Sequence, residues 1–269
     1  MASMWRCSLN EKLRILKLLE EGKISAEETA RLLEALNETA TKKKDRPFGF
    51  WSSMEGIPLM ITSAIAGSFK FAKTNEKLQF PKKKKIEFKG ISGDIEIIGA
   101  ETEMIDLQTD GFAKIKEGSG VLEIKAIGGD VIIMAPKTID LEIRGISGDI
   151  NISNISSEIE IASVSGNIEG VELSGSLHGD FVSGDIDLSY KKIGKIEIKS
   201  KTGDIVLRLN EDIAAELNLE TTHGDIECEF ELKNKEVKKG QLKGIINNPG
   251  AKIELENEYG DVAILKRKY

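Results

Sequence analysis

Apolar and polar residues follow one pattern through the last two-thirds of the chain, arranged around a Gly-Asp pair that recurs. The glycines stand about 18 residues apart, or twice that, and seven of the eight precede an Asp, with Asn167 as the exception. Self-similarity at a fixed period predicts a repeat architecture in which each repeat packs on its neighbours. The glycines are Gly93, Gly129, Gly148, Gly166, Gly184, Gly203, Gly224 and Gly260.

Four apolar columns accompany these glycines. Two stand seven and five residues before the glycine, as in Leu141 and Ile143, and two stand two and four residues after it, as in Ile150 and Ile152. Period-two alternation predicts two short strands joined at the Gly-Asp turn, and such rungs enclose a dry core only when they stack about 4.8 Å apart. We therefore predict a mainly β fold, a single-chain β-solenoid (β-helix) of about 8–10 rungs over residues 80–269.

Two stretches of the repeat region lack the full pattern. One lies near Asp110 and Gly111, and the other lies within residues 233–248. The spacing of the glycines predicts a degenerate rung at each place, with a looped insertion at the second.

The first 40 residues predict a small α-helical hairpin. Ser8–Glu11 and Ser25–Glu28 both fit the capping box that begins a helix, and an apolar stripe follows each of them. Two helices of about 12 residues bury little surface by themselves. We expect domain 1–40 to self-associate or to bind a protein partner.

Residues 41–79 predict a basic linker followed by an amphipathic segment over residues 48–72, whose apolar residues stand four apart and favour a helix. Two interpretations stay open: the segment caps the open end of the solenoid, or it lies in a membrane interface and makes the protein a membrane-surface regulator. It is too short and too interrupted to span a bilayer. The candidate membrane or capping residues are Trp51, Ile57, Ile61, Ile65 and Phe69.

Composition narrows the choice of function. The chain has 269 residues, 26 Gly, 5 Pro and a net charge of −7, which suits tight turns and opposes nucleic-acid binding. Cys7 and Cys228 stand too far apart in the pattern for a disulfide framework or a zinc pair. The start of the chain lacks the apolar region of a secretory signal, so we expect a cytoplasmic protein that contacts the membrane or envelope at most peripherally.

The Gly-Asp column reads as a structural turn and not as a metal ladder. Asn167 replaces the aspartate without its charge, so the position needs a hydrogen-bond acceptor, and the glycine supplies a positive φ or room for close stacking. We expect no bound metal. The turn residues singled out are Gly93, Asp94, Gly148, Asp149, Gly184, Asp185, Gly203 and Asp204.

Between the two apolar columns before each glycine lies an outward column rich in glutamate. A basic column two residues further on offsets it in part, and this compensation fails near Asp180, Glu220 and Glu256. The resulting acidic strip is either a solvated face or a binding face for a cationic peptide, an envelope component or a basic protein. Its glutamates are Glu87, Glu123, Glu142, Glu160, Glu197 and Glu254.

No catalytic group emerges from the pattern. His178 and His223 lack a third ligand or a paired nucleophile at a useful spacing, and no phosphate-binding loop leads from a strand into a helix. A carbohydrate-active β-helix enzyme would need paired carboxylates and aromatic platforms, for which only three tyrosines are available. We predict a non-enzymatic protein without a cofactor.

The repeated Ser-Gly-Asp-Ile unit, as in residues 91–95 and 146–150, resembles the bacterial "putative adhesin" β-solenoid (DUF4097-type) family over about residues 80–269. Residues 11–25 resemble the YvlB/LiaX-like (SHOCT-like) helical domain that precedes such solenoids in Gram-positive bacteria. The resemblance implies a binding or scaffold protein linked to cell-envelope stress or to the response to cationic antimicrobial peptides.

Overall fold

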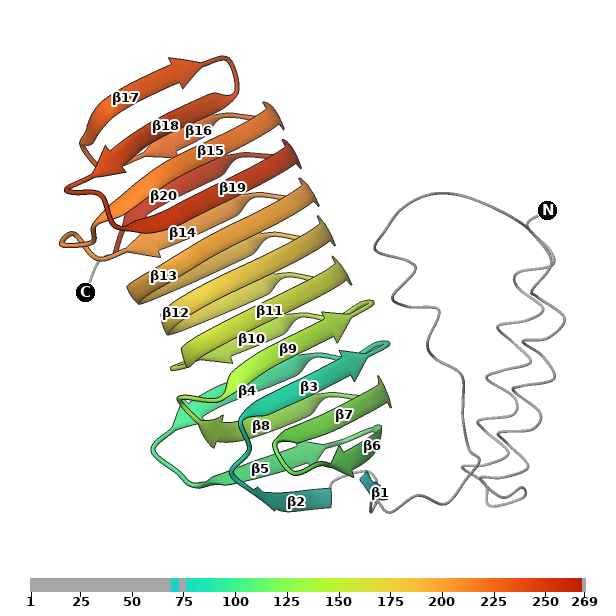
Figure 1. Ribbon diagram of the computed structural model, residues 1–269. Helices are drawn as coiled ribbons and strands as arrows, with labels where there is room; N and C mark the ends of the chain where they lie inside the picture. Colours follow the sequence, from blue (N-terminus) through green and yellow to red (C-terminus); the bar gives the residue numbers. More distant parts are fainter. Residues whose placement is uncertain (1–68, 73–75, 268–269) are drawn as a thin grey trace, which may run out of the picture. The chain divides into compact units, whose positions relative to one another are not determined.

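The computed structural model describes residues 69–72 and 76–267, and within these ranges the chain is built from β-strands and turns (Figure 1). The predicted helical hairpin of residues 1–40 lies outside them. The strands form two sheets that face each other across an apolar core. We call sheet 1 the one whose strands precede the Gly-Asp turn, and sheet 2 the one whose strands follow it.

Sheet 1 runs in space through twelve strands or strand segments. In order they are β1 (Phe69–Ala72), β6 (Phe112–Glu117), β7 (Val121–Gly128), β3 (Lys85–Gly90), β9 (Asp140–Gly145), β11 (Ser156–Ser165), the second halves of β12 (Ile168–Ser183) and β13 (Ile186–Thr202), β19 (Ala251–Tyr259), β15 (Ala215–His223), β18 (Gln241–Ile246) and β17 (Leu232–Lys238).

Sheet 2 runs through ten. In order they are β2 (Glu76–Pro81), β5 (Met104–Thr109), β8 (Val131–Pro136), β4 (Ile95–Ala100), β10 (Ile150–Ser153), the first halves of β12 and β13, β14 (Ile205–Leu209), β20 (Val262–Lys266) and β16 (Ile226–Cys228).

Equivalent repeat positions lie side by side in the parallel part of the stack. Ile150 pairs with Ile168 in sheet 2, and Ile159 pairs with Leu141 in sheet 1. Along the strands of the parallel rungs buried residues alternate with more exposed ones, and the four apolar columns form the core. The described residues contain eight parallel rungs, so the predicted β-solenoid agrees with this curled, mainly β architecture.

The Gly-Asp edge has room for glycine alone. Gly148 has a φ of 120°, and a Cβ added to it would lie 2.1 Å from the carbonyl oxygen of Gly93 in the adjacent rung. Gly166 and Gly184 repeat this arrangement on the rungs above. Any larger residue would meet both a disfavoured φ and a backbone atom, so the rungs approach this closely only through glycine.

A ladder of side-chain hydrogen bonds runs along the same edge. The Asp149 carboxylate accepts the backbone N–H of Asn167 at 2.7 Å, and the Asn167 side-chain oxygen accepts the N–H of Asp185 at 3.0 Å. Each acceptor therefore bonds to the next rung and not to its own turn. The ladder runs without a gap through Asp110, Asp130, Asp94, Asp149, Asn167, Asp185, Asp204, Asp261 and Asp225.

The rungs do not stack in chain order. The rung of β3 and β4 lies between that of β7 and β8 and that of β9 and β10. The rung of β19 and β20 likewise lies between that of β13 and β14 and that of β15 and β16. Both exchanges are visible in Figure 1 as colours out of sequence along the stack.

The two predicted degenerate rungs are wrong. Asp110 and Gly111 join β5 to β6, which run antiparallel to their neighbours, and residues 233–248 contain most of the antiparallel hairpin of β17 and β18. Strand β6 lies beyond the last parallel rung at one end of sheet 1, and β18 and β17 lie beyond it at the other end. Strand β5 lies beyond the last parallel rung at one end of sheet 2. Because a terminal strand presents a row of unpaired backbone groups, a returning antiparallel strand satisfies that row where a further parallel rung is absent.

The end of the predicted amphipathic segment is also extended. Phe69–Ala72 is strand β1, paired antiparallel with β6, whereas the sequence pattern favoured a helix there. A helix satisfies its own backbone and cannot pair with a sheet edge, and an extended segment can. The β structure therefore begins earlier along the chain than residue 80.

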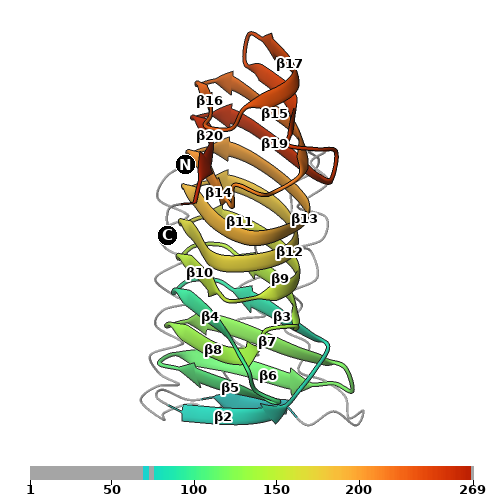
Figure 2. The same ribbon diagram turned by 90° about the vertical axis from the view of Figure 1, so that its left-hand side faces the viewer.

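The edge opposite the Gly-Asp turns is less regular. Strands β12 and β13 each curl around it from sheet 2 into sheet 1, as Figure 2 shows from that side. Positive φ angles occur here at Asn154, Glu172 and Gly175, but no residue pattern recurs from rung to rung. All changes of rung order pass through this edge.

Exceptions in the apolar columns are explained by local packing. Gly179 interrupts the column of Ile143 and Ile161, and the Phe181 ring occupies the space where its Cβ would be, at 2.4 Å. Phe181 is itself 6% exposed. A large side chain beside a glycine therefore keeps the core filled.

Candidate binding face

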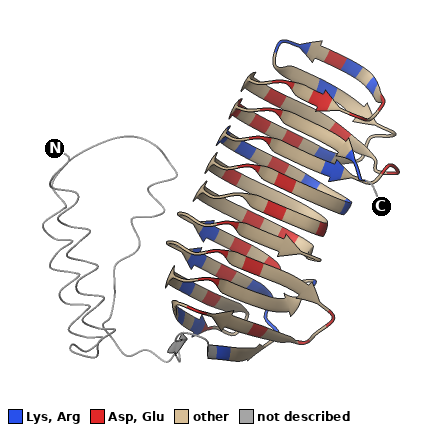
Figure 3. Cartoon of the chain, turned by 180° about the vertical axis from the view of Figure 1, so that it is seen from behind, with Lys and Arg blue, Asp and Glu red and all other residues tan. Residues whose placement is uncertain are grey.

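The six predicted glutamates lie in one column on the outer face of sheet 1, which His178 interrupts. In each case the strand register places equivalent residues opposite each other: Glu123 beside Glu87, Glu87 beside Glu142, and Glu142 beside Glu160. His178 follows Glu160, then come Glu197 and Glu254, and Asn218 ends the column. Figure 3 shows Asp and Glu positions recurring from strand to strand, with Lys and Arg between them.

Ion pairs compensate the first part of this column. Lys116 lies 2.9 Å from Glu123, and Arg144 lies 3.0 Å from Glu142 and 3.5 Å from Glu160. Lys85 donates a hydrogen bond to Glu142, which raises the pKa of the lysine.

Glu142 is the best-compensated member of the column. Burial by itself would raise the pKa of this carboxyl, but the hydrogen bonds and charges of Lys85 and Arg144 outweigh it and hold the pKa below its usual value. The acidic column is thus closely paired over β7, β3, β9 and β11.

Compensation weakens along the stack. Lys195 bridges Glu197 at 2.6 Å and Glu254 at 3.6 Å, and its hydrogen bond lowers the pKa of Glu197. His178 lies 3.5 Å from Asp180 and 3.7 Å from Glu197. Lys195 and His178 therefore provide the basic partners for the acids of this face on β12, β13 and β19.

Besides Glu254, the last two parallel rungs carry acids that form no ion pair. Glu220 on β15 stands directly beside Glu256 on β19 in the strand register, so two like charges are neighbours. Among the described residues neither forms an ion pair with a basic side chain, nor do Glu216 and Glu258 on the same two strands. All four are exposed. We call Glu216, Glu220, Glu256 and Glu258 the acidic end.

Sequence reasoning found only half of this cluster. It placed the failure of compensation at Glu220 and Glu256 but did not single out Glu216 or Glu258. The signal was present, because both lie an even number of residues from those glutamates on the same strands and must therefore face the same way.

An exposed aromatic pair lies at the turns of the same two rungs. The rings of His223 and Tyr259 stack with centroids 4.6 Å apart and planes 6° apart, and Tyr259 is 48% exposed. Other rungs carry Ser, Thr or Gly at this position. His178, by contrast, stands in the glutamate column, so the two histidines lie far apart in the stack.

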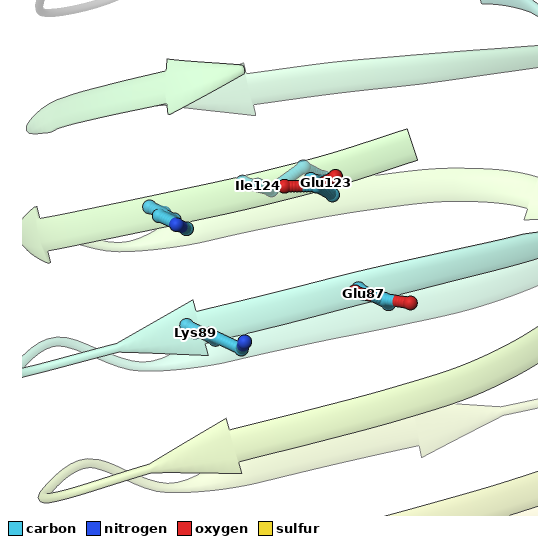
Figure 4. A pocket seen from close by; sticks show the side chains of 5 residues that line it. Glu87, Lys89, Glu123 and Ile124 are labelled. Carbon is cyan, nitrogen blue, oxygen red and sulfur yellow. The ribbon is translucent and has the colours of Figure 1, made fainter. Parts of the chain in front are cut away.

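Hollows in the described part of the surface are shallow and lack convergent chemistry. The depression between β3 and β7, lined by Glu87, Lys89, Glu123, Ile124 and Lys125, encloses no volume for a bound molecule (Figure 4). An open cleft of about 380 Å³ at the edge opposite the Gly-Asp turns is lined partly by Lys82, Glu103, Glu101 and Lys137. These four form two exposed ion pairs, at 3.1 and 2.9 Å.

Within residues 69–72 and 76–267 no group of His, Cys, Asp and Glu side chains is arranged to hold a metal ion. Cys228 is a free, half-buried thiol that packs against the core, and burial raises its pKa. The described ranges contain no helix with the length and apolarity that crossing a bilayer requires.

The remaining predicted site residues fall into two groups. The turn glycines and aspartates, including Gly93, Asp94, Gly203 and Asp204, all lie on the Gly-Asp edge described above. Trp51, Ile57, Ile61 and Ile65 lie outside the described residues, and Phe69 begins β1.

Two family models match the chain. Residues 122–265 match the model described as Toastrack DUF4097, and residues 10–40 match the SHOCT-like domain. These matches confirm the resemblance that the Ser-Gly-Asp-Ile units and the N-terminal segment indicated. No curated protein matches the chain.

Several solved structures are distantly similar. A "putative cell adhesion protein" from Clostridium sporogenes is 14% identical, with 72% of this chain and 100% of that one covered and a TM-score of 0.38. A "putative lipid binding protein" from Parabacteroides distasonis is 15% identical over 72% and 97%, with a TM-score of 0.31. A "putative adhesin" from Bacteroides fragilis is 14% identical over 73% and 97%, with a TM-score of 0.31.

Proposed function

The chain belongs to the Toastrack DUF4097 family, and we propose that it is a non-enzymatic binding or scaffold protein whose acidic end binds a cationic peptide or a basic protein. The single observation that carries this proposal is the uneven compensation of the glutamate column. Glutamates at one end of sheet 1 form ion pairs within the chain, whereas the four of the acidic end form none among the described residues. Lys199 and Lys252 stand beside Glu256 and Glu216 in the strand register without forming an ion pair.

Adjacent like charges without counter-charges cost free energy in the unbound protein. A cationic ligand that lies across β15 and β19 relieves the repulsion between Glu220 and Glu256 as it binds. The exposed rings of His223 and Tyr259 add an apolar surface at the same rungs. The acidic end therefore combines attraction for cations with a small aromatic platform.

The solenoid suits the role of a rigid support. Its strands are locked by backbone pairing on both sides and by the side-chain ladder along the Gly-Asp edge. A preorganised face loses little conformational entropy on binding. In this proposal the SHOCT-like segment, residues 10–40, recruits a protein partner or assembles copies, and the solenoid presents the binding face.

A link to cell-envelope stress is part of the proposal. It rests on the resemblance to solenoid proteins of Gram-positive bacteria and on the fit between an acidic face and cationic peptides. A bacterial strain without this chain is expected to become more sensitive to such peptides.

The direct test measures the affinity of the full chain for decalysine by isothermal titration calorimetry at several salt concentrations. Glu220→Gln combined with Glu256→Gln is expected to weaken binding about fivefold, roughly 1 kcal/mol, because both exposed charges lose their role in attraction. Rising salt is expected to weaken binding by the wild type more than by this variant.

The matched control is Glu87→Gln combined with Glu123→Gln, which removes the same net charge at the compensated end. It is expected to change the affinity by less than about twofold. Equal weakening by both pairs would show attraction by net charge alone, and no heat of binding in the wild type would rule the proposal out.

A further inference from the structure

Five aliphatic side chains, three exposed and two half-buried, form a continuous line on the outer face of sheet 1, beside the Gly-Asp edge. We call this the aliphatic stripe, and in spatial order its members are Ile127, Ile91, Ile146, Val164 and Val182. In each strand the residue just before the stripe member is paired, in the strand register, with the equivalent residue of the next strand. The five side chains therefore lie side by side on consecutive rungs. With rungs about 4.8 Å apart, the stripe is about 19 Å long.

The stripe is exposed although every member is a good core residue. Ile127 is 45% exposed, Ile91 is 43% exposed and Val182 is 37% exposed, while Ile146 and Val164 are half-buried. Single surface aliphatics are ordinary, whereas five in consecutive rungs form a contiguous apolar line that a partner can cover.

Burying the surface next to the stripe carries a small desolvation penalty. Along the Gly-Asp edge it is flanked by small residues whose hydroxyls bond to the chain itself. Ser92 donates to the carbonyl of Ile127 at 3.4 Å, and Ser165 donates to that of Ile146 at 3.3 Å. Since these hydroxyls already have acceptors, a partner that covers them leaves no new unsatisfied polar group.

On its other side the stripe is flanked by a column whose charge changes sign along the stack. In the same spatial order this column reads Lys125, Lys89, Arg144, Ala162 and Asp180. One end is therefore basic and the other acidic. The central Arg144 is compensated within the chain by Glu142 and Glu160.

We propose that the aliphatic stripe is an interface between two copies of this chain, related by a two-fold axis along the strand direction. Such an axis reverses the order of rungs in the second copy and keeps the same columns opposed. Lys125 of each copy then faces Asp180 of the other, and the two stripes lie against each other with the same rung spacing.

The dimer is weak and reversible. The stripe with its charged column covers about 24 Å by 13 Å, roughly 300 Å² per copy, whereas a stable complex buries about 800 Å² per partner. A concentration-dependent equilibrium follows from this area, and the charge pairs set the orientation of the two copies more than the strength of their association.

The test is sedimentation equilibrium of the full chain, from low micromolar to high micromolar concentration. A monomer–dimer equilibrium is expected for the wild type, and Ile91→Asp is expected to weaken it at least about tenfold, because it places a charge in the middle of an apolar contact. The matched control is Val171→Asp on the outer face of sheet 2, where the side chain is 42% exposed. It is expected to leave the equilibrium unchanged.

A charge exchange identifies the second copy as the occupant. Lys125→Asp and Asp180→Lys are each expected to weaken the homodimer, because each creates two like-charged contacts. An equimolar mixture of the two variants is expected to restore association, since both contacts in the mixed dimer again join opposite charges.

Three results overturn the proposal. The first is a chain that stays monomeric throughout the concentration range. The second is a dimer whose dissociation constant does not change with Ile91→Asp. The third is a mixture of the two charge variants that associates no better than each variant alone. If the chain is monomeric and Ile91→Asp instead changes the fluorescence of Trp5 and Trp51 or abolishes binding of a different protein, the stripe is covered by the N-terminal segment or by that protein and not by a second copy.

Discussion

At the Gly-Asp edge seven of the eight parallel rungs turn through a glycine of positive φ, whereas at the opposite edge the chain turns in several ways. The first edge combines stacked glycines with a ladder of side-chain acceptors from Asp110 to Asp225. The second uses isolated positive-φ residues such as Asn154 and Glu172, short loops and the hairpin of β6 and β7. The comparison teaches that a solenoid needs to fix only one of its edges, which leaves the other free to reroute the chain.

The largest effect that tests this comparison is expected from Gly166→Ala on the regular edge. The new Cβ would lie 2.0 Å from the carbonyl oxygen of Gly148, at a φ of 117°. Since neither strain nor clash can relax without moving a neighbouring rung, we expect a loss of about 3–5 kcal/mol in unfolding free energy, measured by urea denaturation.

Its counterpart is Gly120→Ala in a hairpin at the opposite edge, where an added Cβ meets nothing within 4 Å. A change below about 0.5 kcal/mol is expected there. Equal losses at Gly166 and Gly120 would mean that the two edges are under the same constraint.

An intermediate effect is expected from the acceptor ladder. Asp149→Ala removes the acceptor of the Asn167 N–H and is expected to cost about 1–2 kcal/mol in the same denaturation experiment. Asp149→Asn keeps an oxygen in place, as Asn167 does one rung further on, and is expected to cost less than about 0.5 kcal/mol. An asparagine as costly as alanine would show that the charge itself stabilises the edge.

The smallest effect is expected at the opposite edge itself. Asn154 has a φ of 57°, a conformation that asparagine tolerates better than alanine does. Asn154→Ala is expected to lower the unfolding free energy by about 1 kcal/mol, which a small drop in the melting temperature would show. Asn154→Gly is expected to leave the unfolding free energy unchanged. A large loss with either substitution would show that this edge too is tightly specified.

The sequence predicts what the period determines and misses what it does not. The four apolar columns, the Gly-Asp turns and the outward glutamates are all readable, because each position recurs with the same chemistry in most rungs. The order of rungs is not readable, since Ile86 and Leu122 suit any place in the stack equally well.

The antiparallel ends were missed for a related reason. Strands β5, β6 and β18 keep the alternation of the repeat but lack its glycine spacing, and alternation alone does not reveal strand direction. Strand β17 has no such alternation, since every residue after Leu232 is exposed. The aliphatic stripe was overlooked because Ile91 and Ile146 belong to the Ile-Ser-Gly-Asp-Ile unit, where they read as part of the turn.

The exchanged rungs also affect the order in which the protein can form during translation. A solenoid in chain order can add each rung as it leaves the ribosome, but β3 and β4 find both of their parallel neighbours only among strands made later, the last of them ending at Ser153. At about 5–20 residues per second, this rung waits roughly 3–10 s after its own synthesis. At the far end β19 and β20, among the last strands made, insert between older ones. The nascent chain therefore finishes by threading a late rung between two earlier ones, and chaperone protection is most needed over these two intervals.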